Sequence, residues 1–222
     1  MITAVIPYKG ETLGKSRLRS ALSPKGRADL SRGMLQHVLR QMDKASSVDR
    51  VVAVSPHPLP SIETVPDPGQ GLNAAVRAGV ARALTYEPDA VLVIPADLPY
   101  LSVRDLDAMA DGVADDWSSG VVAPSKDGGT GGLLLRANCL IDPAFGQDSA
   151  HRHEQRLRQS GRAPTILHRS GLAIDIDVPA DLDLLGDQLL DVAWRADARD
   201  LDGPVHRPKQ PRENFAGTDL KE

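Results

Sequence analysis

Three cationic side chains and two glycines lie close together near the start of the sequence, in the segment PYKGETLGKSR at residues 7–17. Glycines let backbone N–H groups approach an anion, and Lys9, Lys15 and Arg17 would neutralise the charge of a transferred phosphate. The segment is not a P-loop, because three residues rather than four separate Gly10 from Gly14. It is predicted to bind phosphate in another geometry, and a solvated basic loop is the alternative.

Carboxylates follow two runs that are typical of strands. Asp97 comes just after residues 91–94, and Asp175 and Asp177 lie at the end of residues 173–176, where strand alternation would send both to one face. Open α/β sheets bind ligands at the carboxyl ends of their strands, so Asp97 is the best candidate for a metal ligand and Asp177 is a second one for Mg²⁺. Alternatively, Asp97 and Asp177 cap the helices that follow them.

A second glycine-rich segment, DPGQGLNAA at residues 67–75, contains the spacing G-x-G-x-x-A. It makes a weak dinucleotide fingerprint, because residues 61–66 before it carry proline and Glu63 and would form a poor central strand. As the entry to a helix, the segment can instead offer the Gln70 and Asn73 side-chain amides to a base or a ribose.

Two later loops have the composition of anion sites. Glycines surround Thr130 in DGGTGG at residues 127–132, although a flexible hairpin is an equally natural interpretation. In FGQDSAHRH at residues 145–153, Ser149 is predicted to cap a helix whose first amides face a carboxylate or phosphate, and Arg152 can add a guanidinium to the same anion.

The elements that would position these residues alternate between short β-branched runs and stretches with helical periodicity. The predicted strands are residues 2–6, 51–54, 91–94, 121–123, 133–135 and 173–176, and the predicted helices are 26–43, 72–84, 103–113, 149–159 and 180–189. This order predicts an α/β fold with a mostly parallel central sheet flanked by helices. We expect one domain over residues 1–196 and a flexible tail, rich in proline, glycine and charge, at 197–222.

Composition narrows the classes of partner. The formal net charge is −4 with basic and acidic residues interspersed, and aromatic residues make up 3% of the chain, which argues against nucleic acid as a partner. The single Cys139 excludes an internal disulfide, and the first apolar run is too short for a signal peptide or a membrane span. We expect a cytoplasmic protein, with a homodimer left open.

Six ordered motifs resemble the guanylyltransferases that start the side chain of the deazaflavin coenzyme F-420, relatives of the molybdenum-cofactor guanylyltransferases. The family's P-x-K and A-K-S-R-L resemble residues 7–9 and 14–18, G-L-N-A-A resembles 71–75, and A-D-L-P resembles 96–99. Its D-G-G-T, F-G-x-x-S with R-H, and D-I-D-x-P-x-D-L resemble 127–130, 145–153 and 175–182. The likeness extends to about residue 189.

This resemblance implies a single Rossmann-like nucleotidyltransferase domain of the nucleotide-diphospho-sugar transferase type. It implies that GTP is held by the opening loop and by the segment containing Gly71 and Asn73, and that Asp97 binds Mg²⁺. It also implies that Thr130, Gly146 and Ser149 hold the carboxylate of a small phosphorylated acid. Two departures, Gly10 in place of proline and Gly131-Gly132 in place of Asn-Ala, suggest an unusual acceptor.

The expected reaction transfers GMP from GTP to the phosphate of 2-phospho-L-lactate, phosphoenolpyruvate or 3-phospho-D-glycerate, with release of pyrophosphate. Lys9, Lys15, Arg17 and Asp97 are the expected catalytic residues, since bringing two anions together is the main burden. Three alternatives stay open. They are a nucleotidyltransferase of the same fold with another nucleotide or acceptor, a P-loop ATPase or kinase, and a catalytically silent nucleotide-binding module.

Overall fold

A seven-stranded sheet forms the centre of the protein, with strand order β3-β2-β1-β4-β6-β5-β7. The structure is a computed structural model that describes residues 1–13, 15–113, 118–161 and 163–185. Its strands are β1 (Ile2–Pro7), β2 (Arg50–Ser55), β3 (Glu63–Pro66), β4 (Ala90–Val93), β5 (Gly120–Pro124), β6 (Thr130–Arg136) and β7 (Thr165–Ile166). The helices are α1 (Gly10–Leu13), η1 (Ser16–Ser20), α2 (Pro24–Lys44), α3 (Leu72–Leu84), α4 (Val103–Asp111), α5 (Ser149–Gln159), α6 (Ser170–Ala173) and η2 (Pro179–Leu184).

The middle of the sheet is parallel because helices cover both of its faces. Strand β1 pairs in parallel with β2 and with β4, whereas β6 runs antiparallel to both β4 and β5. Strands buried on two faces need apolar side chains at successive positions, and residues 3–6 of β1 are all buried. The prediction of a mostly parallel α/β sheet from nearly continuous apolar runs is confirmed.

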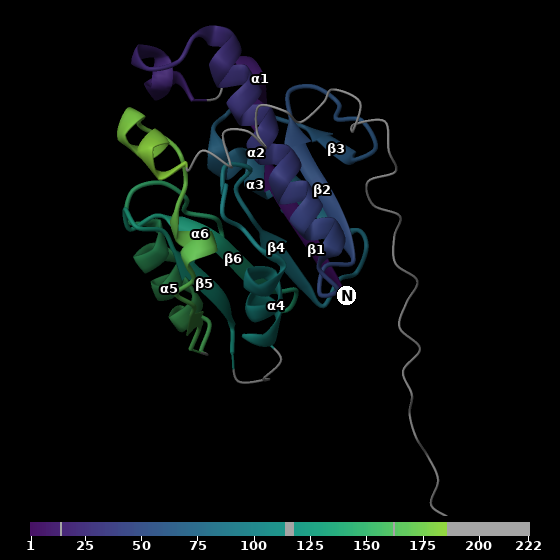
Figure 1. Cartoon of the computed structure of the whole chain (residues 1–222). Coiled ribbons are helices and arrows are strands. Elements are labelled where there is room, and N and C mark those ends of the chain that lie inside the picture. The colour runs from purple at the N-terminus through teal and green to yellow at the C-terminus, as the bar shows by residue number, and fades with distance from the viewer. Residues whose placement is uncertain (14, 114–117, 162, 186–222) are drawn as a thin grey trace, which may run out of the picture.

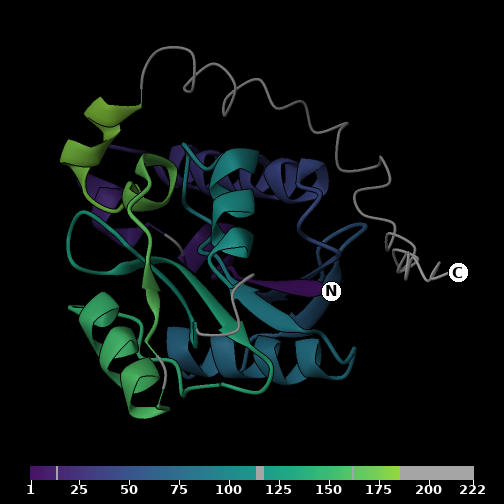
Figure 2. The ribbon, with the colours of Figure 1, turned by 90° about the horizontal axis from the view of Figure 1, so that it is seen from below.

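Two hydrophobic cores lie on opposite faces of this sheet. Ala4 and Ile6 of β1 pack toward α2 and α4, whereas Val5 between them packs toward α3. Figures 1 and 2 show the same layers, with α2 and α4 on one side of the sheet and α3 and α5 on the other. Within the described residues, no helix combines the length and apolar character that a membrane span requires.

Two predicted elements near the end of the chain are different in the structure. The predicted strand at 173–176 is wrong: α6 ends at Ala173, and Ile176 packs against Leu18 and Leu30 instead of joining the sheet. The edge beside β5 is instead taken by the short strand β7. The predicted helix at 180–189 is the short 3₁₀ helix η2 as far as Leu184, and residues 186–189 lie outside the described residues.

The remaining predictions about the elements are largely confirmed. Helices α2, α3, α4 and α5 match the four earlier periodic segments. Residues 63–66, which were expected to make a poor central strand, form the edge strand β3 beside β2. The predicted end of the domain at residue 196 and the tail at 197–222 lie outside the described residues.

Gly131 allows the backbone of α6 to approach the sheet very closely. A Cβ atom at this position would lie 1.6 Å from the carbonyl oxygen of Leu172, so no side chain fits without movement of the backbone. The adjoining Gly132 also faces a tight space, where a Cβ would meet Ile94 and Met109 at 3.2 Å. The two glycines that depart from the family motif are therefore needed for packing between β6 and the segment that leads to Asp175.

We predict that Gly131→Ala lowers the free energy of unfolding by about 2–3 kcal/mol or more, because the methyl group must displace backbone rather than a flexible side chain. For a chain of this size, the melting temperature should fall by roughly 5–10 °C in thermal denaturation. Gly26→Ala in α2 is the matched control, since its Cβ would make ordinary contacts of 3.4 Å or more with the side chains of Ser23 and Leu22. Equal melting temperatures for the two variants would contradict the close approach.

Candidate active site

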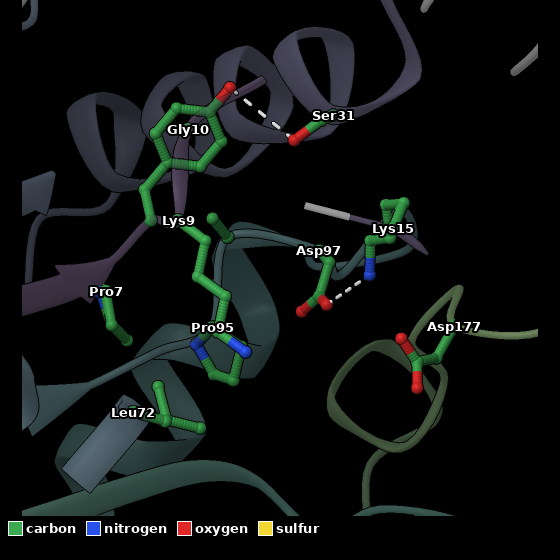
Figure 3. A pocket seen from close by; sticks show the side chains of 11 residues that line it. Pro7, Lys9, Gly10, Lys15, Ser31, Leu72, Pro95, Asp97 and Asp177 are labelled. Atoms are coloured by element: carbon green, nitrogen blue, oxygen red, sulfur yellow. Dashed lines mark hydrogen bonds and ion pairs between the residues drawn. The ribbon is translucent and has the colours of Figure 1, made fainter. Parts of the chain in front are cut away.

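A pocket of about 150 Å³ opens at the carboxyl ends of β1 and β4. The loop after β1 contributes Lys9 and Lys15, the loop after β4 contributes Asp97, and the segment after α6 contributes Asp177 (Figure 3). Parallel pairing of β1 with β4 places these carboxyl ends side by side, which is where open α/β sheets bind ligands. Four of the residues predicted from the sequence thus line one pocket.

Lys15 and Asp97 form an ion pair across the pocket, with 2.5 Å between Nζ and Oδ2 (Figure 3). The Lys15 side chain is only 7% exposed and that of Asp97 is 29% exposed, so the surrounding protein weakens solvent screening of this pair. Lys15 also adopts a left-handed backbone conformation, with φ of 57°. A non-glycine residue rarely does so without a local constraint, and such strain concentrates at functional sites.

A second ion pair lies at the exposed rim of the same pocket. Nη1 of Arg17 is 2.6 Å from Oδ2 of Asp177, and both side chains are largely accessible to solvent. Arg17 does not itself line the pocket but reaches it through Asp177. Each candidate metal ligand therefore has a cation as its partner, which places alternating charges where a polyphosphate and a divalent cation would be bound.

The structure excludes the capping alternative for both carboxylates. Helix α4 is capped by Ser102, whose backbone N–H donates to Asp105, so Asp97 does not cap it. At η2, the Asp181 carboxylate accepts hydrogen bonds from the backbone N–H groups of Asp177 and Val178. The Asp97 and Asp177 carboxylates are thus left for the pocket rather than used at a helix end.

Asp175 is close enough to this site to be affected by its charge. The pKa of the Asp175 carboxyl is raised to about 6, chiefly by burial and then by the negative charges of Asp97 and Asp127, against a smaller lowering by Lys15. Crowded carboxylates of this kind are stabilised by a bound cation. The expectation that strand alternation would align Asp175 with Asp177 is wrong, because this segment is not a strand.

The carboxylate oxygens of Asp97 and Asp177 are of the ligand type that Mg²⁺ prefers. Mg²⁺ prefers hard oxygen ligands and is commonly held by one or two carboxylates together with substrate phosphates. Asp97 and Asp177, which line one pocket, provide such a pair. In the part of the chain that the structure describes, no group of three or more His, Cys, Asp or Glu side chains is arranged to hold a metal ion without a substrate.

The segment at the start of α3 connects this pocket with the loop before α5. Gly71 precedes α3 with φ of 89°, and Leu72 lines the pocket. The Asn73 carboxamide bonds to the backbone of Phe145 in both directions, donating to the carbonyl at 3.1 Å and accepting from the N–H at 2.7 Å. Asn73, expected as a GTP ligand, therefore also joins the two loops.

Thr130, Ser149 and His153 form a buried polar cluster where β6 meets α5. Oγ1 of Thr130 lies 2.9 Å from Oγ of Ser149 and 3.0 Å from Nδ1 of His153. The structure thus brings together two residues expected to hold the acid, while Gly146 and Arg152 lie on the exposed side of the same loop and helix. The Arg152 guanidinium donates to the Gln147 carbonyl, which holds it at this loop.

His153 is the residue of this cluster to which the sequence assigned no role. The pKa of the imidazole is lowered to about 4, chiefly by burial and then by the positive charges of Arg156 and Arg152. Its spacing of four residues from Ser149 on a predicted helix was the available signal, because residues at i and i+4 share a helical face. His153 is thus a neutral hydrogen-bonding residue near pH 7.

The fold and this site define a nucleotidyltransferase. Solved structures with the same fold include a protein from Desulfovibrio desulfuricans described as a nucleotide-diphospho-sugar transferase, 15% identical with a TM-score of 0.71 over 84% of this chain and 87% of that one. A 4-diphosphocytidyl-2C-methyl-D-erythritol synthase is 18% identical, with a TM-score of 0.58 over 86% and 98%. At these identities the likeness concerns the fold.

Residues 2–188 match the family described as guanylyl transferase, CofC like, and the chain belongs to this family. It is similar to the phosphoenolpyruvate guanylyltransferase of Sphaerobacter thermophilus, with 36% identity over 82% of this chain and 91% of that one. The 3-phospho-D-glycerate guanylyltransferase of Phenylobacterium zucineum is 33% identical, over 82% and 88%. The 2-phospho-L-lactate guanylyltransferase of Methanopyrus kandleri is 28% identical, over 80% and 87%. The family resemblance inferred from the motifs is confirmed.

We predict that His153 makes the protein less stable in acid. Above pH 6.5 the residue is neutral in both the folded and the unfolded chain, so it contributes no pH dependence there. Between pH 6.5 and 4 the unfolded chain binds a proton that folded His153 does not, so the free energy of unfolding falls as the pH falls, by about 3 kcal/mol in full.

Urea unfolding at several pH values measures this slope. His153→Gln should flatten the pH dependence in this window, whatever its effect on stability at pH 7. His151→Gln, the same change at an exposed position of α5, should leave the slope unchanged. A slope in His153→Gln that equals that of the unmodified protein would show that His153 is not the group that titrates.

Proposed function

We propose that the protein transfers GMP from GTP to the phosphate of a small phosphorylated three-carbon acid, in the biosynthesis of coenzyme F-420. The observation that carries the proposal is the convergence of Lys9, Lys15, Asp97 and Asp177 on one pocket at the carboxyl ends of β1 and β4. Two cations and two carboxylates at that place match the needs of a reaction between two anions and a divalent cation.

In this reaction a phosphate oxygen of the acid attacks the α-phosphorus of GTP. A new P–O bond forms there, the bond from the α-phosphorus to the oxygen bridging the β-phosphorus breaks, and pyrophosphate leaves with that electron pair. No general base is required, since the second pKa of a phosphate monoester is about 6 and the nucleophile is ionised at neutral pH. Positioning and charge neutralisation are therefore the main contributions of the enzyme.

The cationic residues would carry most of that charge neutralisation. Exposed Lys9 lies in the pocket and can reach phosphate oxygens, while Lys15 and Arg17 can exchange their present carboxylate partners for phosphate. Asp97 and Asp177 would hold Mg²⁺, which supplies a Lewis acid that neutralises developing charge on the phosphates. When Lys15 pairs with a phosphate instead of Asp97, Asp97 would be free to bind the cation, and buried Lys15 would still have an anionic partner.

The acid would be bound on the other side of the sheet's carboxyl edge. Thr130 and Ser149 offer hydroxyl groups, Gly146 offers backbone without a side chain, and Arg152 offers a guanidinium at the same loop. Gly71 and Asn73 would contact GTP at the start of α3, adjoining Leu72 in the pocket. Phosphoenolpyruvate is the first acceptor to test, because the names of several similar relatives specify it.

We also propose a cytoplasmic location, where GTP and phosphorylated acids are available, and a homodimer. Analytical ultracentrifugation of the purified protein measures the oligomeric state directly. A sedimentation coefficient of the monomer at micromolar concentration would reject the dimer without affecting the proposed reaction.

Incubation with GTP, Mg²⁺ and each of the three acids tests the reaction. Mass spectrometry should detect a guanosine diphospho-acid with one of them, together with pyrophosphate in equal amount. Transfer from CTP instead, or release of inorganic phosphate from GTP, would refute the proposed reaction in favour of another nucleotidyltransferase or a phosphohydrolase. Binding of GTP with no product from any acid would indicate a silent nucleotide-binding module.

We predict that Asp97→Asn reduces kcat by at least about 1,000-fold, since stabilisation by a metal ion contributes several kcal/mol to the transition state. The substitution keeps the shape of the side chain but removes the charge that binds both Lys15 and Mg²⁺. The equivalent change at the exposed Asp111 of α4, Asp111→Asn, should leave kcat unchanged. Thermal denaturation checks that both variants fold, and full activity of folded Asp97→Asn would remove this residue from the mechanism.

A further inference from the structure

Hydrogen bonds link the buried residues Thr130, Ser149 and His153 to one another and to the backbone of Ala144. Besides Nδ1, which lies 3.0 Å from Thr130, the imidazole uses its other nitrogen: the backbone N–H of Ala144 donates to Nε2 at 2.9 Å. Both His153 and Ser149 are completely buried, and Thr130 is 7% exposed. Each polar atom of this cluster must therefore find its partners within the protein or in a bound ligand.

The backbone of Ala144 selects one tautomer of His153. A backbone N–H is always a donor, so Nε2 must carry a lone pair and the ring proton must be on Nδ1. Protonation of Nε2 would place two hydrogens against each other in a buried contact. Phe145 packs edge-on against the ring, with centroids 4.8 Å apart, and is itself held by Asn73, so the ring has a fixed orientation.

This tautomer determines how the hydroxyl hydrogens are used. Nδ1–H donates to Oγ1 of Thr130, and one hydroxyl of the Thr130–Ser149 pair donates to the other. The two hydroxyls have two hydrogens and their mutual contact uses one, so one O–H remains as a donor. With the opposite tautomer, Thr130 would donate to Nδ1 and Ser149 to Thr130, and no hydroxyl hydrogen would remain.

We propose that His153 is a positioning residue that keeps one hydroxyl hydrogen of the Thr130–Ser149 pair available to the carboxylate of the acid substrate. The proposal rests on the proposed function, because it names the atom at which that function binds its acid. A carboxylate accepts hydrogen bonds and donates none, so a site that presents only acceptors would repel it. His153 thereby acts through Thr130 and Ser149 and does not touch the substrate.

The charges around the ring agree with this role. Arg152 and Arg156 on α5 are the charged groups that affect His153, and both oppose its protonation. The ring is therefore neutral at the pH where the enzyme would work, and the same two arginines add positive potential for an anion. The acid site then combines two features. Inside the protein, neutral His153 fixes the hydrogen bonds of Thr130 and Ser149, and closer to the surface Arg152 and Arg156 supply positive charge.

Nitrogen-15 NMR of the histidine-labelled protein without substrate tests the hydrogen arrangement by itself. We expect Nε2 of His153 to give the signal of an unprotonated ring nitrogen and Nδ1 that of a protonated one, unchanged from pH 8 to pH 5.5. A protonated Nε2, or titration of the ring in this range, would overturn the proposal. This measurement needs neither turnover nor a variant, so it is decisive even if the protein transfers no GMP.

Two substitutions at this position separate the roles of the two nitrogens. His153→Asn can keep a donor near the position of Nδ1, whereas His153→Gln can keep an acceptor near Nε2 and loses the donor to Thr130. We expect His153→Gln to raise the KM for the acid about 10- to 100-fold with the KM for GTP changed less than about twofold. His153→Asn should restore the KM for the acid to within about threefold of the unmodified enzyme.

His151→Gln on the exposed face of α5 is the control and should change neither KM. Equal increases in the KM for acid and for GTP, or equal effects of the Asn and Gln variants, would reduce His153 to a structural residue and reject the proposal. Absence of GMP transfer by the unmodified protein to any acid would reject the proposed function instead, and the NMR result would still decide the tautomer.

Discussion

The parallel pairing of β1 with β4 is the constraint on which the site depends. It places the loop after β1 next to the loop after β4, so that Lys15 meets Asp97 across 82 positions of sequence. Neither charge would be stable at this depth alone, since removal from water costs several kcal/mol unless an opposite charge compensates it. The sheet thus holds opposite charges from distant parts of the sequence together in one pocket.

Backbone packing has an equally direct effect on the charges near the pocket. Because Gly131 has no side chain, the Leu172 carbonyl comes against β6 and brings the following residues, including Asp175, toward the pocket. The raised pKa of the Asp175 carboxyl reflects this approach, since burial and the charges of Asp97 and Asp127 cause it. The glycine at position 131, which departs from the family motif, is thus linked through α6 to the electrostatics of the carboxylates around the pocket.

A set of hydrogen bonds and one ring contact joins the start of α3 to the cluster where β6 meets α5. Asn73 at the start of α3 binds the backbone of Phe145, Phe145 packs on His153, and His153 bonds to Thr130. Such buried polar contacts have low tolerance for rearrangement, because each group that loses its partner stays desolvated. The start of α3, the loop before α5 and the start of β6 are thereby fixed relative to one another.

The sequence by itself determined the class of fold, four of the main helices and the charged residues that line the pocket. Those features depend on local patterns: apolar runs bounded by glycine, helical periodicity, and polar residues that directly follow strands. It also indicated Lys9, Lys15, Asp97 and Asp177 as members of one site, because the carboxyl ends of parallel strands share an edge.

Only the tertiary structure decided which partners these residues have. The run at 173–176 has strand composition, but its Ile176 is buried against Leu18 and Leu30, and the sheet edge beside β5 is occupied by β7. Likewise, the sequence assigned His153 no role, and only the structure shows Thr130 and the backbone of Ala144 at its two nitrogens. Partner choice depends on contacts between residues distant in sequence, and the energy of a buried hydrogen bond is set by the groups that surround it.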